Sequence, residues 1–222
     1  SWNDIILLDS NYGDSNTILS DPLIKASENF VVVTWNKNEY PGDEELVATY
    51  STDSGDSWSS PEAIDPAYNH FIIYDYTGIV SPDGDFHVVW SGVKDSSDNY
   101  YNIFYQKSED GGQTWGDEVL ISDSDSENSL SPAISLSGSN VHIVWEQYYS
   151  SQSYYAVEYV KSSNNGDTFS SPSTISSTNS ISETTVSSQG SNLVIGWLED
   201  SDSGYLLKSK SSSNAGSSFG TE

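Results

Sequence analysis

STDSGDSW, at residues 51–58, is the first of four related stretches in this chain. Each follows the pattern Ser-x-Asp/Asn-x-Gly-x-x-Trp/Phe, and the later copies are SEDGGQTW (108–115), SSNNGDTF (162–169) and SSNAGSSF (212–219). Their starting residues, 51, 108, 162 and 212, lie 57, 54 and 50 positions apart. A β-branched run that ends in tryptophan recurs with a similar spacing, at Trp35, Trp90, Trp145 and Trp197. Two independent landmarks with one period predict a fourfold structural repeat.

The third repeat shows most clearly what one unit contains. Four short runs rich in β-branched and aromatic residues, separated by turn residues, cover 131–137, 141–147, 154–162 and 170–176. Such runs predict strands, and no stretch of about 12 residues has the periodicity of a helix. Four antiparallel strands in about 50 residues are typical of one blade of a β-propeller. Because a blade cannot bury both of its faces alone, neighbouring blades must stack on it.

We therefore predict an all-β fold: a single β-propeller domain over residues 1–222, with four antiparallel four-stranded blades at 21–65, 71–122, 131–176 and 180–219. Residues 1–9 (SWNDIILLD) look like the strand that follows each complete recurring stretch, and the last stretch has no such strand after it. Residues 1–9 are thus expected to complete the last blade as its outer strand. Three arrangements remain open: pairing within the chain, which closes a ring; pairing with another copy by β-augmentation; or the chain being part of a larger propeller.

The recurring stretch has the composition of a fixed turn. Its Asp accepts hydrogen bonds from nearby backbone N–H groups, its Gly supplies backbone freedom, and its Trp or Phe covers the turn. Asn replaces Asp in the last two copies and keeps the acceptor oxygen without the charge, which favours a structural role over acid–base chemistry. The residues expected to have this structural role are Ser51, Asp53, Gly55, Trp58, Ser108, Asp110, Gly112, Trp115, Ser162, Asn164, Gly166, Phe169, Ser212, Asn214, Gly216 and Phe219.

These stretches resemble the Asp-box, or BNR, repeat of sialidase-like β-propellers, and the resemblance covers nearly the whole chain. It implies a propeller whose boxes are structural hairpins away from the active face. It does not select a function, because such propellers include sialidases, other polysaccharide-cleaving enzymes, lectins, sorting receptors and assembly factors. Sialidases of the family are expected to hold the substrate carboxylate with arginines, for which lysine is not an equal substitute. This sequence has no Arg, so we do not expect sialidase activity; Lys107 and Lys161, directly before a box serine, are expected to face solvent.

The charge of the chain excludes several partners. It carries 33 acidic residues against 7 basic ones, a net charge of −26. Nucleic acids and anionic membranes need basic patches, so neither is an expected partner. No run of about 18 apolar residues is present, so no membrane insertion is expected, and the absence of Cys excludes disulfides and thiolate chemistry. The acidic, serine-rich composition favours an extracellular or cell-surface location.

Two tyrosine pairs in loops are the candidate ligand-binding residues: Tyr100 with Tyr101, and Tyr148 with Tyr149. Aromatic rings bind the apolar faces of sugars and also occur at protein interfaces. Packing within strands produces the same pattern, so this alternative stays open. His87 and His142 lie three residues before Trp90 and Trp145, where the other repeats have Val, and are expected in the core.

A loop in the second half of the chain is a candidate metal site. Asp123, Asp125 and Glu127 stand at alternate positions, and oxygen ligands at this spacing suit Ca²⁺. The glycine and the final glutamate of an EF-hand loop are missing. No cofactor is expected to be required, and bound calcium remains a possibility.

The predicted function is that of a non-catalytic extracellular or cell-surface propeller. It would recognise glycan or protein, or assemble with copies of itself through its N-terminal strand. The alternative is a carbohydrate-active enzyme, a glycosidase or lyase, that acts on a glycan other than sialic acid. Carboxylate pairs do not decide between them, because 33 acidic residues place some pair at a catalytic distance by chance.

Overall fold

The computed structural model describes residues 5–10, 16–39, 44–64, 72–94, 97–122, 127–201 and 204–220. Within them the chain is all β, with no helix, and its strands form four antiparallel sheets, the blades. Blade 1 contains β1 (Thr17–Ser27), β2 (Phe30–Glu39), β3 (Glu44–Ser51) and β4 (Glu62–Ala63). Blade 2 contains β5 (Ile72–Val80), β6 (Phe86–Val93), β7 (Asn102–Ser108) and β8 (Val119–Leu120). Blade 3 contains β9 (Asn128–Ser137), β10 (Asn140–Tyr149), β11 (Tyr154–Ser162) and β12 (Ser173–Thr178), and blade 4 contains β13 (Ile181–Gln189), β14 (Asn192–Ser201) and β15 (Gly204–Ser212).

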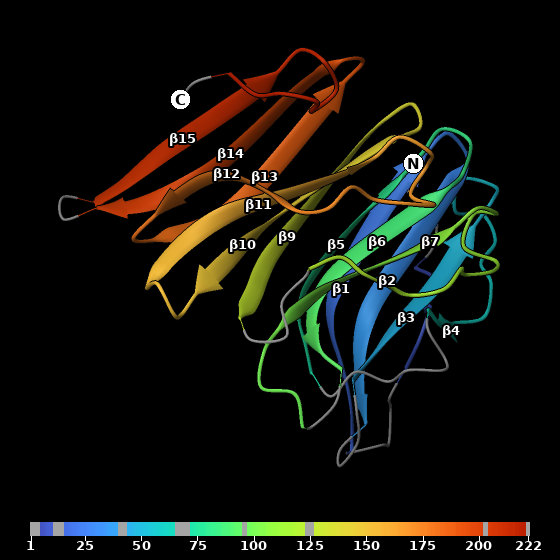
Figure 1. The fold of residues 1–222 in the computed structure, drawn as a ribbon. Coiled ribbons are helices and arrows are strands. Elements are labelled where there is room, and N and C mark those ends of the chain that lie inside the picture. Colours follow the sequence, from blue (N-terminus) through green and yellow to red (C-terminus); the bar gives the residue numbers. More distant parts are fainter. Residues whose placement is uncertain are drawn as a thin grey trace.

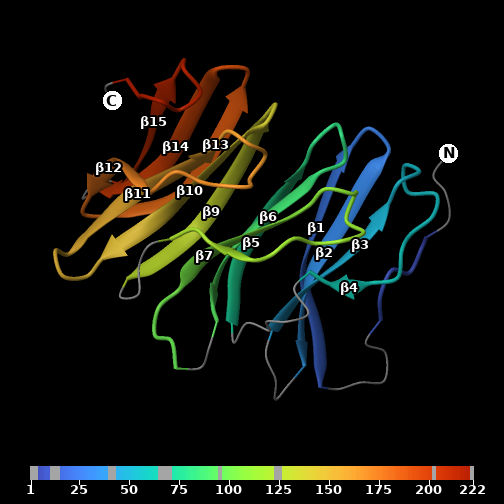
Figure 2. The same ribbon diagram turned by 45° about the vertical axis from the view of Figure 1, so that its right-hand side comes forward.

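The blades stand side by side in chain order, from blue to red in Figures 1 and 2. Within each blade every strand pairs with the next one along the chain. The first strands of neighbouring blades contact one another, whereas the short fourth strands lie at the outer edge. The result is an arc of blades with β1, β5, β9 and β13 along its inner side.

The hydrophobic core consists of three clusters, each shared by two neighbouring blades. Trp90, Trp145 and Trp197 are at most 2% exposed, and each belongs to the cluster shared with the preceding blade. Full burial of such a side chain contributes on the order of 2–3 kcal/mol. Stacking of one blade on the next therefore supplies most of the apolar burial, as the repeat pattern implies.

Two of the interfaces between blades contain a buried histidine–tyrosine pair. His87 and His142 are fully buried, and their Nδ1 atoms lie 2.6 Å and 2.8 Å from the hydroxyls of Tyr105 and Tyr159. Valine stands at the equivalent position in blades 1 and 4. Burial is the main reason why the pKa of each histidine is lowered to about 4, so both are neutral at pH 7.

The last blade differs from the prediction. Its sheet has three strands in the described part of the chain, with β15 at the edge. Residues 5–10 form no strand, and Ile5, Ile6 and Leu7 are 100%, 50% and 79% exposed. Figure 2 shows this dark blue segment beside blade 1, at the opposite end of the molecule from β15. Described residues 5–9 therefore do not complete blade 4 of the same chain, and the sheets form an open arc rather than a closed ring.

We expect the free energy of unfolding to decrease as the pH falls from about 6.5 to about 4. In this window the unfolded chain binds protons at His87 and His142, whereas the native protein, with its lowered histidine pKa values, does not. The loss amounts to at most about 3 kcal/mol for each histidine. Urea unfolding over this pH range measures it. The double variant H87Q/H142Q, whose amides do not titrate, should show a flatter profile, and an unchanged profile would contradict the explanation.

Candidate functional site

Each blade has two different ends. At the box end the first two strands form a hairpin, such as Ser27 opposite Phe30, and the box follows the third strand. At the other end, which we call the loop end, the second strand connects to the third. The two ends have different side chains and different roles.

All four boxes have the same hydrogen bonds. The serine hydroxyl donates to the Oδ1 atom of the Asp or Asn at distances of 2.7–2.8 Å, and it accepts the glycine N–H at 2.8–3.0 Å. Asp53 also accepts the hydroxyl and the N–H of Ser57, which lower its pKa to about 2. The members of these networks are Ser51, Asp53 and Gly55; Ser108, Asp110 and Gly112; Ser162, Asn164 and Gly166; and Ser212, Asn214 and Gly216. The aromatic residues Trp115, Phe169 and Phe219 pack against the core clusters between the blades, and the Trp58 indole N–H donates to Gly55 O at 3.1 Å.

Each of the last two boxes covers a tyrosine of the preceding blade. The hydroxyl of Tyr105 lies 1.9 Å from the position that a Cβ atom at Gly166 would occupy, and Tyr159 has the same relation to Gly216. Both glycines also have positive φ angles. Only a glycine leaves room for this contact, so these two box glycines are needed for blade packing as well as for the turn.

Two lysines also cross from one blade to the next box, contrary to the expectation that they face solvent. Lys107 Nζ bonds to the Asp167 carboxylate at 2.5 Å and to Asn165 O at 3.2 Å. Lys161 Nζ bonds to Ser217 Oγ at 2.8 Å. The alternation of side chains along each strand points these lysines at the following blade, so they connect neighbouring blades.

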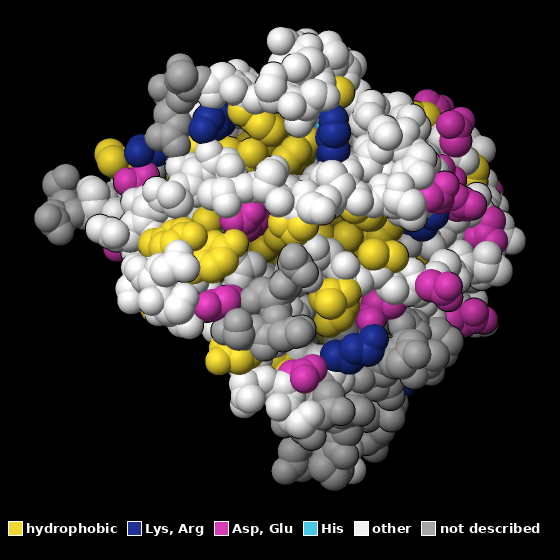
Figure 3. All heavy atoms as spheres, in the orientation of Figure 1, with side chains coloured by type: hydrophobic (Ala, Val, Ile, Leu, Met, Phe, Trp, Pro, Cys, Tyr) yellow, Lys and Arg dark blue, Asp and Glu magenta, His cyan; other side chains and the backbone are white. Residues whose placement is uncertain are grey.

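The loop end contains the two tyrosine pairs, and the members of one pair lie on opposite faces of their blade. Tyr148 and Tyr149 are adjacent on β10 and so point to opposite faces of blade 3. Tyr148 lies against Tyr155 with ring centroids 4.7 Å apart, and Tyr149 stacks on Tyr154 at 4.9 Å. In Figure 3 hydrophobic side chains gather over these ends of β10 and β11, with acidic side chains beside them.

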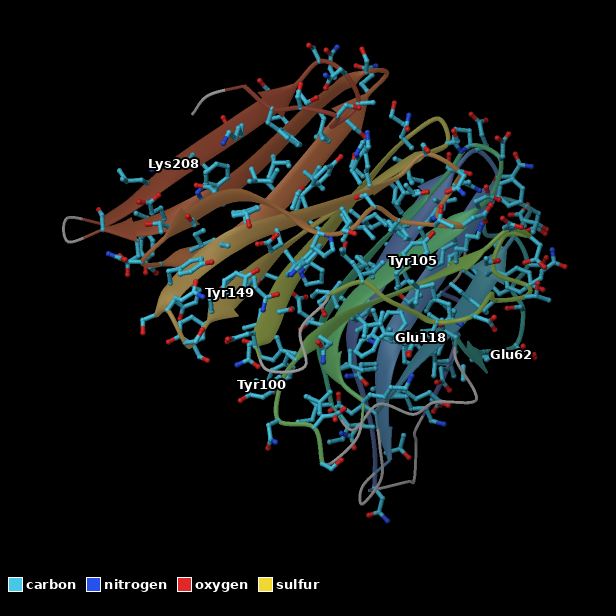
Figure 4. The ribbon with its side chains drawn as sticks, in the orientation of Figure 1. Glu62, Tyr100, Tyr105, Glu118, Tyr149 and Lys208 are labelled. Atoms are coloured by element: carbon cyan, nitrogen blue, oxygen red, sulfur yellow. The ribbon has the colours of Figure 1, made fainter. Side chains whose placement is uncertain are left out.

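The other pair lies at the loop end of blade 2. Tyr101 lies against Tyr74 of β5, with ring centroids 5.4 Å apart, and its N–H donates to Asn128 Oδ1 at 3.0 Å. Tyr100 is half-buried, and Figure 4 shows it at the same end of the arc as Tyr149. Through Asn128 the loop ends of blades 2 and 3 are held together.

A buried carboxyl group lies beside the Tyr149 ring. Glu158 Oε1 accepts the hydroxyl of Tyr149 at 3.0 Å and that of Thr174 at 2.7 Å. Burial raises the pKa of Glu158, and burial together with the Glu158 charge raises the pKa of Tyr149 above its ordinary range. Tyr149 thus stays a hydrogen-bond donor, next to a carboxyl group that binds a proton more readily than usual. We call Tyr100, Tyr101, Tyr149, Glu127 and Glu158 the tyrosine–carboxylate surface.

A second carboxyl group with a raised pKa lies on the other face of β10. Glu146 is 9% exposed, and burial raises its pKa to about 7. It shares its face with Tyr148, toward blade 4. A carboxyl group that titrates near neutral pH is suited to general acid–base chemistry.

The inner strands contribute residues that sequence reasoning missed. Asp21, Ser131 and Glu183 have φ angles of 52–53° at bulges in β1, β9 and β13. Non-glycine residues in this region cost roughly 1–3 kcal/mol and cluster at functional sites. Burial, and to a lesser degree the charge of Asp21, raises the pKa of Asp75 on β5, so a carboxylate of blade 1 acts on one of blade 2 on the inner side. Pro22 and Pro132, directly after two of the bulges, are the sequence signal that could have indicated them.

The predicted metal site is only partly within the described residues. Asp123 and Asp125 lie outside them, and the Glu127 carboxylate accepts the N–H of Ser150 at 2.7 Å. Among the residues that the structure describes, no group of three or more His, Cys, Asp or Glu side chains is arranged to hold a metal ion. Calcium binding stays a prediction.

Comparison with known families and structures identifies the class of protein. Residues 16–215 match the family of BNR repeat-like domains, and the chain belongs to this family. No curated protein matches the sequence. In the described part of the chain, no helix is long and apolar enough to cross a bilayer.

Several solved enzymes share the fold. A Trypanosoma rangeli sialidase in complex with sialic acid has a TM-score of 0.61 and 14% identity over 90% of this chain and 37% of its own. The NanB sialidase from Streptococcus pneumoniae has a TM-score of 0.61 and 10% identity, over 98% of this chain and 53% of its own. A polysaccharide lyase, an ulvan lyase, has a TM-score of 0.65 and 9% identity, over 90% of this chain and 54% of its own. The chain thus spans between a third and just over half of the length of these enzymes.

These neighbours correct the prediction of a non-catalytic protein. That prediction rested on the absence of recognisable catalytic residues, on the acidic, serine-rich composition and on the complementary ends of the chain. The missing arginines bear on sialic acid but not on other glycans. The ulvan lyase and the sialidases show that enzymes of different reaction classes share this fold. The lack of Arg therefore bears on sialidase activity alone, and the alternative of a glycosidase or lyase remains open.

The variant Gly166→Ala should be strongly destabilised, by about 2–4 kcal/mol, because its Cβ atom would collide with the Tyr105 hydroxyl. Gly138→Ala is the matched control: its φ is also positive, but no atom lies within 4 Å of the added Cβ. The control should lose about 1 kcal/mol for backbone strain alone. Thermal unfolding measures both, and equal losses would show that the tyrosine contact is not tight.

Proposed function

We propose that this chain is part of a carbohydrate-active propeller that binds a neutral or cationic glycan at its tyrosine–carboxylate surface and cleaves it there, as a glycosidase or lyase. The observation that carries the proposal is the buried Glu158 carboxyl group, hydrogen-bonded to Tyr149 at 3.0 Å on a surface with stacked aromatic rings. The similarity of the chain's fold to sialidases and to a polysaccharide lyase also supports a carbohydrate substrate.

Each part of the surface has a role in such chemistry. The rings of Tyr149 and Tyr101 offer apolar faces to sugar rings. Glu158, whose pKa is raised by burial, is suited to transfer a proton. The protonated Tyr149 donates its hydroxyl to Glu158, so its oxygen can accept a hydrogen bond from a hydroxyl group of the substrate. The net charge of −26 repels acidic polysaccharides, and this chain offers no arginine to hold a sialic acid carboxylate. These features favour an uncharged or cationic glycan, and an extracellular location fits such a substrate.

A panel of neutral and cationic polysaccharides tests the proposal by product release and by binding. Glu158→Gln should lower the rate at least about 100-fold, since it removes the proton-transfer group, and Tyr149→Phe should lower it because Glu158 loses the hydrogen bond that Tyr149 donates to it. Tyr148→Phe is the control, because this neighbouring tyrosine points to the opposite face of β10. Absence of both binding and products across the panel would overturn the proposal, as would equal behaviour of the three variants.

A second candidate function is self-association through residues 5–9. The outer edge of β15 pairs with no strand in the described part of the chain, and the apolar residues Ile5, Ile6 and Leu7 are exposed. In blades 1–3 the residue four positions after the box aromatic pairs with the residue three before the box serine: Glu62 with Ala48, Val119 with Tyr105, and Ser173 with Tyr159. Counting from Trp2, the same register pairs Ile6 with Ser209 of another copy.

Cysteine cross-linking tests this register, because the chain has no cysteine of its own. Mixed Ile6→Cys and Ser209→Cys chains should form a disulfide-linked dimer under oxidising conditions. Ile5→Cys, whose side chain would point to the other face of the strand, should cross-link poorly with Ser209→Cys. A protein that stays monomeric at all concentrations and gives no cross-link would rule out this association.

A further inference from the structure

Blades 1 and 2 border a cavity of about 290 Å³, partly open to solvent, next to the box of blade 2. Ala48, Tyr50 and Glu62 line it from blade 1, and Gln113 and Trp115 line it from the box of blade 2. The cavity lies at the box end and toward the outer edge of the arc. Figure 4 shows Glu62 at this outer edge, well separated from Tyr149 at the loop end. The cavity is therefore distinct from the tyrosine–carboxylate surface.

This space is open because blade 1 has a smaller residue than blades 2 and 3 at one equivalent position. Ala48 lies three residues before its box serine, the position that Tyr105 and Tyr159 occupy in blades 2 and 3. In those blades the tyrosine ring fills the gap between two blades and reaches beneath the next box glycine. Alanine has no side chain to do so. The cavity thus exists in one interface because the chain places Ala where its other complete blades have Tyr.

A second substitution gives the cavity an aromatic wall. Tyr50 stands directly before its box serine, where blades 2 and 3 have Lys107 and Lys161. These lysines bond to the next box, whereas Tyr50 packs against it, with its Cβ atom 3.1 Å from the ideal Cβ position of Gly112. The first interface between blades therefore has a ring where the others have a charge.

The remaining walls provide hydrogen-bonding groups. Trp115 is held by an edge-to-face contact with Phe86, with ring centroids 5.5 Å apart. The Gln113 amide NH₂ donates to Asp110 O at 2.6 Å, which leaves its carbonyl oxygen as an acceptor. The exposed Glu62 provides a carboxylate. Aromatic rings bind the apolar face of a sugar, and these oxygens accept its hydroxyl groups.

We propose that this cavity binds a single neutral sugar ring between Tyr50 and Trp115, with hydroxyl groups of the sugar donating to Glu62 and Gln113. The volume is at the lower end of the range for small-molecule sites, which fits one ring better than an oligosaccharide. The Glu62 carboxylate disfavours an anionic ligand. The site is independent of the proposed activity at the loop end, because no residue belongs to both.

The test of the site places at position 48 the tyrosine that blades 2 and 3 have at the equivalent position. Ala48→Tyr should fill the cavity, as Tyr105 and Tyr159 fill the equivalent spaces. Wild-type protein titrated with glucose and, separately, galactose should show a saturable change in tryptophan fluorescence, with a Kd in the millimolar range. Ala48→Tyr should weaken this binding at least tenfold and leave binding or cleavage of polysaccharide at the loop end unchanged. Tyr149→Phe should have the opposite pattern.

Three further variants keep the test decisive if Ala48→Tyr does not fold. Glu62→Gln alters an exposed side chain and should weaken sugar binding several-fold, whereas Asp200→Asn, an exposed carboxylate in blade 4, should not. Trp115→Phe should remove the fluorescence change. No saturable response of the wild type up to roughly 100 mM sugar, or equal affinity of Glu62→Gln and Asp200→Asn, would overturn the proposal.

Discussion

The contact between the third strand of one blade and the box of the next is the interaction on which the rest of the structure depends. A blade has two apolar faces and cannot bury either without a neighbour. The box provides a rigid surface for this packing, because its serine and its Asp or Asn fix the backbone through hydrogen bonds of 2.7–3.0 Å. The histidine–tyrosine pairs, the crossing lysines and the tryptophans all act at this same junction.

Because the box end holds the blades together, the loop end is free to vary. Turns there differ in length and sequence between the blades. The two tyrosine pairs and the buried carboxyl group of Glu158 lie toward this end. Glu158 and Tyr149 are positioned by β10 and β11, which are rigid strands in the middle of the arc. This division of roles is common in proteins that bind ligands through loops on a stable scaffold.

Much of the fold could be predicted from the sequence, and the reasons for success and failure are physical. The period of the box and of the tryptophans predicts the blades, since both mark positions that every blade needs for packing. Adjacent residues of a strand point to opposite faces of the sheet, so the sequence was sufficient to predict that Tyr148 and Tyr149 lie on different faces of β10. The bulges at Asp21, Ser131 and Glu183 depend on tertiary packing of the inner strands, and only Pro22 and Pro132 hint at them. The partner of residues 5–9 could not be predicted, because strand pairing leaves no local signal that distinguishes one edge from another.

Blade 4, with three strands in the described part of the chain, has a consequence for local unfolding. Val194 is 47% exposed and Leu207 is 79% exposed, although their equivalents in blade 2, His87 and Ile103, are fully buried. In an array whose stability is the sum of its units and of the contacts between neighbours, a unit with one neighbour is less stable than a unit with two. Among the described blades, blades 1 and 4 each have one neighbour, and blade 4 has in addition only three described strands. Local opening should therefore start in β15 and proceed inward, with amide protons of blade 4 exchanging well before those of β6 and β10. Among the described blades, blade 4 is therefore expected to open first.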